Sequence, residues 1–268
     1  MGKEINFFAE DPGRYERFQQ EFRAQHIIED VLDEILARHR DALKEREGEE
    51  RDLSRLIGGL CFGKAHKTFQ AIIRLCALGL GEDAAILLRS NINLLINVYF
   101  ILKDTDPIER CNEFVDYSLS ERMRYIDDAH EGKFPEWMKK ISIENKKRIK
   151  DRARKWSKNR IKDRAKKMDD SSYLLHYRQG YQLYSSLEHA DVMALSGYVH
   201  DENGTNLRIS SGPSDDYIGV VLVHNYAVMA DLLVAVMNYY GIQRADLVEK
   251  LHRVWRALDQ DAGASFVT

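Results

Sequence analysis

The sequence contains few of the residues on which disulfide-rich and turn-rich folds depend. It has only three cysteines, Cys61, Cys76 and Cys111, an odd number without the Cys-x-x-Cys spacing of redox and zinc sites. We predict that they are buried free thiols of a protein in the reducing cytoplasm. The four prolines and sixteen glycines are thinly spread, which argues against a β architecture with many tight turns.

Motifs for secretion, cofactors and metals are also missing. The N-terminal residues contain no apolar run of the kind found in signal peptides. The chain has no phosphate-binding glycine loop and no Gly-x-Ser-x-Gly nucleophile elbow. A di-iron bundle needs two Glu-x-x-His helices, whereas this chain offers only Asp127-x-x-His130. We therefore predict neither a cofactor nor a metal site.

Apolar residues, by contrast, are plentiful and recur at helical spacing. They make up 44% of the chain, which is enough for a sizeable core. We predict a single all-α domain over residues 1–268, a helical bundle of about seven or eight helices. Its parts are an N-terminal helix within 1–48, a core bundle over 50–240, and a C-terminal helix and tail over 243–268. The expected core helices cover residues 52–78, 82–104, 107–131, 171–199 and 217–240, with one long loop over 200–213.

The helix predicted over 217–240 is long and apolar enough to cross a bilayer. It contains His224, Asn225 and Asp231, and a central aspartate costs about 3 kcal/mol on membrane-insertion scales. We therefore interpret it as a buried core helix and predict no membrane contact. Asp215 or Asp216 should cap its start.

A polar stripe interrupts the otherwise apolar helix predicted over 82–104. Arg89, Asn93 and Asn97 recur every four residues, a spacing that favours one side of a helix. Because the rest of this helix is apolar, it should be buried. A buried guanidinium keeps its charge and has five donors to satisfy, so another segment must supply acceptors.

A second polar stripe, Tyr177, Tyr181, Ser185 and His189, follows the helix predicted over 171–199. We expect the two stripes to face each other. In a catalytic interpretation, His189 is a general base and Ser185 or Tyr181 a donor or nucleophile.

In the same interpretation, Arg89, with Asn93 beside it, stabilises a phosphate or an oxyanion. In a structural interpretation, these residues form a buried hydrogen-bonded network that fixes helix register. A nearby acidic residue such as Glu188 or Asp191 would support the structural interpretation. Both interpretations are open at this point.

Charge is very unevenly distributed along the chain. Residues 139–168 contain fifteen lysines and arginines against three acidic residues, so this segment has a net charge of +12 and the remainder −15. We predict one long basic helix here that binds RNA or DNA phosphates. The candidate ligand-binding residues of this segment are Lys147, Arg148, Arg152, Lys155 and Arg160, around Trp156, and Tyr181 of the second stripe is a further candidate. Pairing with an acidic protein surface and plain solvation are the alternatives.

Two short motifs carry a resemblance to a known group of proteins. The first is Leu87-Leu88-Arg89-Ser90 followed by Asn93, and the second is Tyr181 and Ser185 ahead of His189. Over roughly residues 50 to 240, the chain resembles an uncharacterised family of all-helical bacterial proteins, a domain of unknown function. The family has Glu where this chain has Asn93, so no carboxylate chemistry is expected there. The resemblance implies a fold and a pairing of the motifs, but no substrate.

Two further catalytic patterns occur at about their chance frequency. Arg124 and His130 have the spacing of helical nucleases of the HEPN type, but roughly two such matches are expected by chance in this composition. His200-Asp201, with His176 and Asp231, contains the residue types of an HD phosphohydrolase, although His200 lies at the edge of a loop. Neither match therefore adds support to the corresponding hypothesis of a nuclease or a phosphohydrolase.

Three functional hypotheses follow from the sequence. The first is a nucleic-acid-associated helical protein, such as a bacterial defence or toxin-type factor, that uses the basic segment. The second is an RNase or other hydrolase built on Arg89 and His189. The third is a non-catalytic scaffold with structural polar stripes. The apolar content is also compatible with a homodimer.

Overall fold

The computed structural model describes residues 53–130, 143–189, 199–201, 207–209, 213–214 and 216–242, together with 245, 246 and 249. The helix predicted within 1–48 lies outside the described residues, as does most of the segment from 243 to the C-terminus. In the part that is described, the fold is all-α apart from one small ribbon of two strands. The predicted fold class is therefore confirmed.

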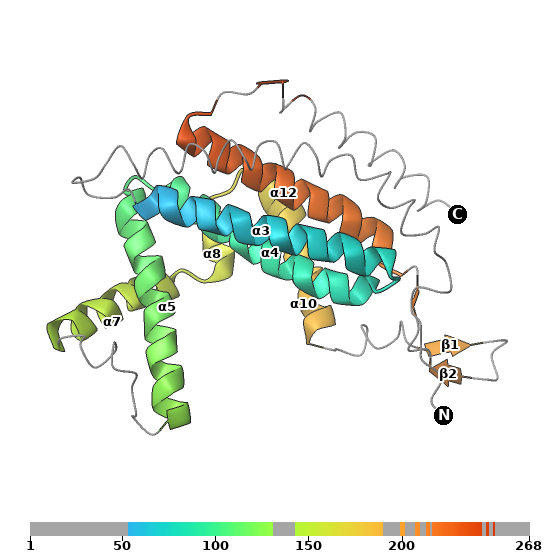
Figure 1. The fold of residues 1–268 in the computed structure, drawn as a ribbon, viewed down its shortest axis with the longest axis horizontal. Coiled ribbons are helices and arrows are strands. Elements are labelled where there is room, and N and C mark those ends of the chain that lie inside the picture. Colours follow the sequence, from blue (N-terminus) through green and yellow to red (C-terminus); the bar gives the residue numbers. More distant parts are fainter. Residues whose placement is uncertain are drawn as a thin grey trace.

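Three long helices form the centre: α3 (Leu53–Ala77), α4 (Gly81–Leu102) and α12 (Ile218–Tyr240) pack on one another (Figure 1). Their bounds agree closely with the helices predicted over 52–78, 82–104 and 217–240. The fully buried core includes Phe62, Phe69, Leu88, Ile92, Leu95, Val228 and Leu233. Burying a side chain of this kind contributes about 1.5–3 kcal/mol. Both α4 and α12 are long and apolar enough to span a membrane, and most of each apolar stretch is buried inside the bundle.

The turn between α3 and α4 brings the start of α12 close to it. Gly79 has a φ of +77°, and its carbonyl accepts a hydrogen bond of 2.9 Å from the Ser214 N–H. A Cβ added at Gly81 would lie 2.0 Å from the Asp216 carbonyl oxygen, so the backbones touch there. Tyr217, with a φ of 62°, occupies the N-cap of α12 without a side-chain cap. The predicted aspartate cap is thus wrong for Asp216, and Asp215 lies outside the described residues.

A second, smaller layer is built by α5 (Pro107–His130) and α7 (Ile143–Lys158). Figure 1 shows α5 running away from the central helices with α7 beside it. The predicted start of α5 is confirmed, because Asp106 Oδ1 accepts the Glu109 N–H at 3.0 Å and Pro107 is the first helical residue.

The basic segment is divided, whereas the sequence predicted one long helix over 139–168. Helix α7 ends at Lys158, and α8 (Ile161–Ala165) begins after Arg160, whose backbone is extended. The Asn159 carbonyl at the break accepts a hydrogen bond of 3.0 Å from Arg164 Nε. The break lets the segment bury Trp156 in the α5 layer and Ala165 in the central core.

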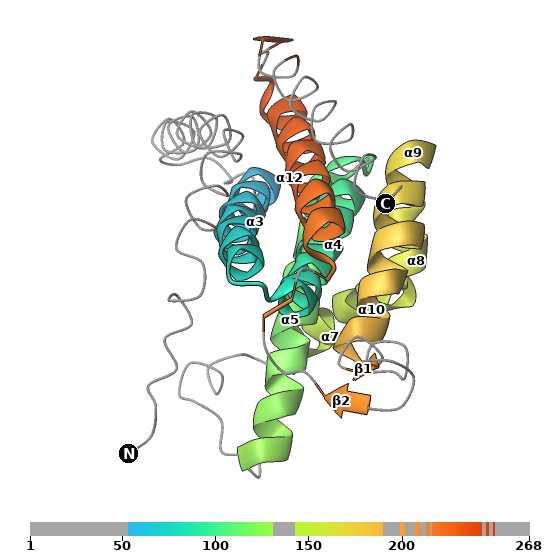
Figure 2. The ribbon, with the colours of Figure 1, turned by 90° about the vertical axis from the view of Figure 1, so that its right-hand side faces the viewer.

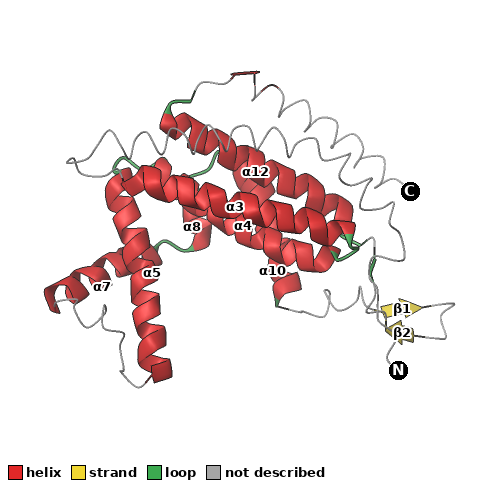
Figure 3. Cartoon of the chain, viewed as in Figure 1, coloured by secondary structure: helices red, strands yellow, loops and turns green. Residues whose placement is uncertain are grey.

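The segment predicted as one helix over 171–199 contains α9 (Asp170–Ser172), the π-helix η1 (Tyr173–Tyr181) and α10 (Gln182–Glu188). Figure 2 shows α9 and α10 along one side of α4 and α12. Residues 190–198 lie outside the described residues. Strands β1 (Val199–Asp201) and β2 (Leu207–Ile209) then pair antiparallel, with Val199 opposite Ile209 (Figure 3). The sequence predicted only a loop there.

Candidate functional site

The structure brings Arg89 of α4 and Tyr181 of η1 together. Arg89 Nη2 donates a hydrogen bond of 3.2 Å to the Tyr181 hydroxyl, and its guanidinium carbon lies 4.8 Å from the centre of the Tyr181 ring. The same guanidinium forms an ion pair with Glu188 of α10. Glu188 is the acidic partner that the structural interpretation expected. Because Glu188 balances its charge, Arg89 works as a tie between α4 and the η1–α10 segment.

The other candidate catalytic residues do not share a buried pocket with Arg89. Asn93 is exposed and Ser185 half-buried. The His189 side chain is 70% exposed, and its Nε2 lies 4.0 Å from Glu188 Oε2. The predicted general base therefore stands at the surface, next to the carboxylate that pairs with Arg89.

The predicted polar stripe of α4 is not a buried seam along its whole length. At about 100° per residue, a spacing of four drifts by roughly 40° at each step, so Arg89, Asn93 and Asn97 spread around the helix. Asn91 is the residue that faces α3, where its amide donates to the Ala65 carbonyl at 3.1 Å. Asn97 is also buried, and its Oδ1 accepts a hydrogen bond from Arg164 of α8.

In the basic segment, the structure places Trp156 inside the protein. Its side chain is 1% exposed. The centres of the Phe100 and Phe114 rings lie 5.4 and 5.0 Å from its own, and the Arg164 guanidinium covers its face at 4.9 Å. Trp156 therefore anchors α7 and has no face available for a ligand.

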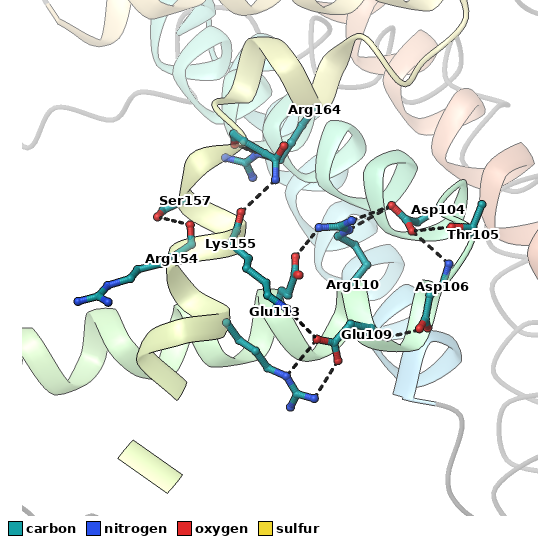
Figure 4. Close-up of polar contacts among 12 residues, drawn as sticks. Asp104, Thr105, Asp106, Glu109, Arg110, Glu113, Arg154, Lys155, Ser157 and Arg164 are labelled. Carbon is teal, nitrogen blue, oxygen red and sulfur yellow. Dashed lines mark hydrogen bonds and ion pairs between the residues drawn. The ribbon is translucent and has the colours of Figure 1, made fainter. Parts of the chain in front are cut away.

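Two of the predicted ligand-binding cations hold α7 to α5. Arg152 donates to both carboxylate oxygens of Glu109, with Nη2 2.8 Å from Oε2, and its Nη1 lies 3.7 Å from Asp116. Lys155 Nζ lies 3.7 Å from the same Glu109 (Figure 4). This is pairing with the acidic remainder of the chain, one of the alternatives that the sequence left open.

Other cations of this segment point outward. Ile149, Ala153 and Trp156 lie on the buried side of α7, and helical spacing puts Lys147 and Lys158 on the opposite side. Seven cations of α7, α8 and their flanks are exposed and have no ion-pair partner within the described ranges: Lys147, Arg148, Lys150, Lys158, Arg160, Lys162 and Lys167. We call these seven residues the basic surface.

Local ion pairs reduce this charge only slightly. Arg154 Nη1 lies 3.7 Å from Asp151, and Lys166 Nζ lies 3.1 Å from Asp163, each within one helical turn. Exposed pairs of this kind are worth at most about 1 kcal/mol and are screened by salt. A polyanion could therefore displace them.

A chain of hydrogen bonds that sequence reasoning did not assemble crosses the bundle. The Tyr184 hydroxyl lies 3.2 Å from His224 Nδ1, and His224 Nε2 lies 3.0 Å from His176 Nδ1. His176 Nε2 then lies 2.9 Å from Asp231 Oδ2. His224 and Asp231 are polar residues seven positions apart on an apolar helix, and this shared face was the signal available in the sequence.

The surroundings of this chain are dry and tightly packed. His176 is fully buried, and burial, followed by the proximity of His176, lowers the pKa of His224 to about 3. A Cβ at Gly180 would lie 1.9 Å from Cε1 of His224, so only glycine lets the ring approach the backbone of η1. The wider turn of a π-helix accompanies this approach, as is common at functional positions.

The side chains of His130, His200 and Asp201 lie outside the described residues, so the structure does not place the two chance patterns as sites. Arg124 is exposed and pairs with Glu121 at 2.7 Å. His176 bonds directly to Asp231, while His200 and Asp201 belong to β1. Across the described ranges, no group of three or more His, Cys, Asp or Glu side chains is arranged to hold a metal ion.

The cysteines are buried and form no disulfide. Burial raises the pKa of Cys61 to about 11 and that of Cys76 to about 12. Because the thiolate is the reactive form, these two residues act as small apolar side chains and not as nucleophiles.

The fold and these contacts define a helical-bundle protein with an arginine–carboxylate tie, a buried histidine chain and an exposed basic surface. The chain matches the family described as "Family of unknown function (DUF5677)" over residues 55–206, more than half of its length, and belongs to that family. This agrees with the resemblance to an uncharacterised all-helical family. No curated protein and no solved structure matches the chain.

Proposed function

We propose that this protein associates with nucleic acid through the basic surface on α7 and α8. The proposal rests on one observation: the cations of this segment fall into two groups with different surroundings. Arg152 and Lys155 are used in ion pairs with α5, whereas the seven cations of the basic surface face solvent. The sequence could not separate these two groups, because both belong to one run of charge.

A rigid helix that presents lysines and arginines on one side suits a phosphate backbone. Lys147 and Lys158 are eleven residues apart, or roughly 16 Å along α7 at 1.5 Å per residue. Phosphates follow one another every 3.4 Å along each strand of a duplex, so the helix spans several of them. Contacts of this kind fix position without reading sequence, and we expect binding that depends little on base sequence.

The experiment compares two triple variants with the wild-type chain. The test variant is Lys147→Gln, Arg148→Gln, Lys158→Gln on α7, and the control is Lys64→Gln, Lys67→Gln, Arg74→Gln at exposed positions of α3. Both remove two lysines and one arginine, so the net charge changes equally. Binding to a labelled 20-base-pair RNA or DNA duplex and to single-stranded RNA is measured between 50 and 200 mM salt.

We expect the test variant to weaken binding at least tenfold and to reduce the slope of log affinity against log salt by roughly two to three, since each phosphate contact contributes about 0.7–0.9. The control should bind like the wild type. Equal loss in both variants would mean a nonspecific charge effect, and wild-type binding that does not respond to salt would refute the proposal.

The hydrolase alternative has weaker support. A site that stabilises phosphate or oxyanion charge needs a cation that is not already neutralised, and Glu188 pairs with Arg89. We therefore place the basic surface ahead of Arg89 and His189 as the functional feature. A cytoplasmic defence or toxin-type factor is the biological setting that we propose for such binding. It implies that expression of the wild type slows bacterial growth more than expression of the α7 variant.

A further inference from the structure

The hydrogen-bonded chain from Tyr184 to Asp231 connects two layers of the bundle. Tyr184 belongs to α10 and His176 to η1, whereas His224 and Asp231 belong to α12. The η1–α10 segment also packs on α4, where Arg89 pairs with Glu188. These hydrogen bonds therefore form a polar connection between η1–α10 and α12. The protonation states of the two histidines decide whether the hydrogen bonds can form.

The carboxylate fixes every proton in the chain at neutral pH. An ionised Asp231 can only accept, so His176 must carry its proton on Nε2, and its Nδ1 becomes an acceptor. His224 then donates from Nε2 to His176 Nδ1, across 3.0 Å. His224 Nδ1 is left as an acceptor, and the Tyr184 hydroxyl donates to it across 3.2 Å.

One added proton can be accommodated without moving any ring. His176 becomes doubly protonated, paired with Asp231, and donates from Nδ1 to His224. The single proton of His224 then shifts to Nδ1 and is donated to the Tyr184 oxygen. All three contacts survive with two of their directions reversed, and the new charge lies beside a carboxylate 2.9 Å away.

A second proton cannot be accommodated. With both rings doubly protonated, two N–H groups point at each other across the 3.0 Å contact and no acceptor lies between them. The two cationic rings would also be stacked, with their centres 5.2 Å apart and their planes 19° from parallel. We propose that the His176–His224 contact is a proton-operated latch, which holds η1–α10 on α12 with no added proton or one and releases it when a second binds.

The other titratable groups around the latch leave this proton count unchanged. From α4, Tyr99 faces Asp231 and Asp169, and burial, then these two charges, raise its pKa. Lys103 lies on the Tyr99 ring, 4.7 Å from its centre. Because its pKa is raised, Tyr99 keeps its proton as the pH falls from 7 to 4.

At the outer end of the chain, the Ser172 hydroxyl lies 2.8 Å from Asp231 and 3.1 Å from Asp169. Hydrogen bonding by the Ser172 N–H, partly opposed by burial, lowers the pKa of Asp169. At the inner end, Cys76 of α3 lies near Tyr184, and burial raises the pKa of both groups. These neighbouring groups therefore leave the proton count of the two imidazoles unchanged.

The test is hydrogen exchange of the full chain between pH 7 and pH 4, expressed as protection factors for η1–α10 and for α3. Opening that takes up one proton should lower the protection of residues 176–188 about tenfold per pH unit below the open-state histidine pKa of about 6.5. Helix α3 should keep its protection, because its packing on α4 does not involve the latch. This result does not depend on what the basic surface binds.

Two variants separate the latch from general acid unfolding. Tyr184→Phe keeps both imidazoles and should retain the pH dependence, whereas His224→Gln removes one and should abolish it. In the wild type at pH 7, nitrogen-15 NMR should show both histidines protonated on Nε2, which tests the assignment without any variant. Parallel loss of protection in α3 and η1–α10, an unchanged slope in His224→Gln, or the opposite tautomers would each overturn the proposal.

Discussion

At the scale of single residues, Gly180 is the position where the backbone leaves least room. Its replacement by alanine would put a methyl group 1.9 Å from His224 Cε1, and the ring is held on its other sides by Tyr184 and His176. We predict that Gly180→Ala lowers the free energy of unfolding by about 1–3 kcal/mol, as overpacked cores do. Chemical denaturation measures this directly.

Gly63 supplies the matched control. It lies within α3, and nothing stands within 4 Å of the position that its Cβ would occupy. Gly63→Ala should therefore stabilise the protein by up to about 1 kcal/mol, through helix propensity alone. If both substitutions shift stability in the same direction, Gly180 is not needed to make room for the His224 ring against η1.

At the scale of elements, the question is what holds α7 in place while its outer side carries so much like charge. Trp156 is buried between Phe100 and Phe114, so we predict that Trp156→Ala costs about 3–5 kcal/mol, the range for large aromatic truncations. Lys158→Ala on the exposed side should change stability by less than about 0.5 kcal/mol. Thermal and chemical denaturation of both variants provide the comparison.

Substitutions of Trp156 also distinguish between two roles for this residue, direct contact with nucleic acid and anchoring of α7. If Trp156 contacted nucleic acid directly, Trp156→Ala would weaken binding and leave stability unchanged. An anchoring role gives the reverse order: stability falls first, and binding fails because the helix is displaced. Trp156→Phe, which keeps an aromatic ring in the same site, should then recover most of the lost stability.

At the scale of the whole molecule, helix positions were predictable and the division of polar residues between inside and outside was not. The apolar periodicity of α3, α4 and α12 is strong enough to give their bounds within a few residues. The inward positions of Asn91 and Asn97 depend on where α3 and α8 supply partners. Trp156 likewise sits among charges in sequence, and only the placement of α5 shows that it is buried.

The candidate site divides in the same way. The contact between Arg89 and Tyr181 follows from two stripes of residues at intervals of four, and the sequence predicted it. The hydrogen bonds between His176, His224 and Asp231 could not be predicted in this way. They depend on the close approach of η1 and α12 near Gly180, which no local sequence pattern encodes. The β-ribbon was missed because each strand has only three residues, too few for alternation to be recognised.

Acid stability is the property of the whole molecule that this buried chain controls. Burial and His176 lower the pKa of His224 to about 3, whereas an unfolded histidine has a pKa of about 6.5. Between about pH 6.5 and pH 3, His224 is therefore protonated in the unfolded protein but neutral in the native protein. The contribution of His224 to the free energy of unfolding should therefore be constant above about pH 6.5. It should fall by about 1.4 kcal/mol per pH unit as the pH decreases from 6.5 toward 3.

Carboxylates contribute in a separate window. Burial raises the pKa of Asp104, but hydrogen bonds from Asp106 and Arg110 outweigh it and lower the net value, and the Ser172 N–H lowers that of Asp169. Stability from these groups is lost only as the pH falls below about 4, near their unfolded pKa. Denaturant titrations from pH 7 to 4.5 avoid these carboxylates, and His224→Gln should make the profile flatter there. If the latch opens at some pH within this range, the wild-type slope should end at that same pH, because the native chain then binds the proton too. A wild-type profile as flat as that of the variant would show that His224 is already protonated in the folded protein.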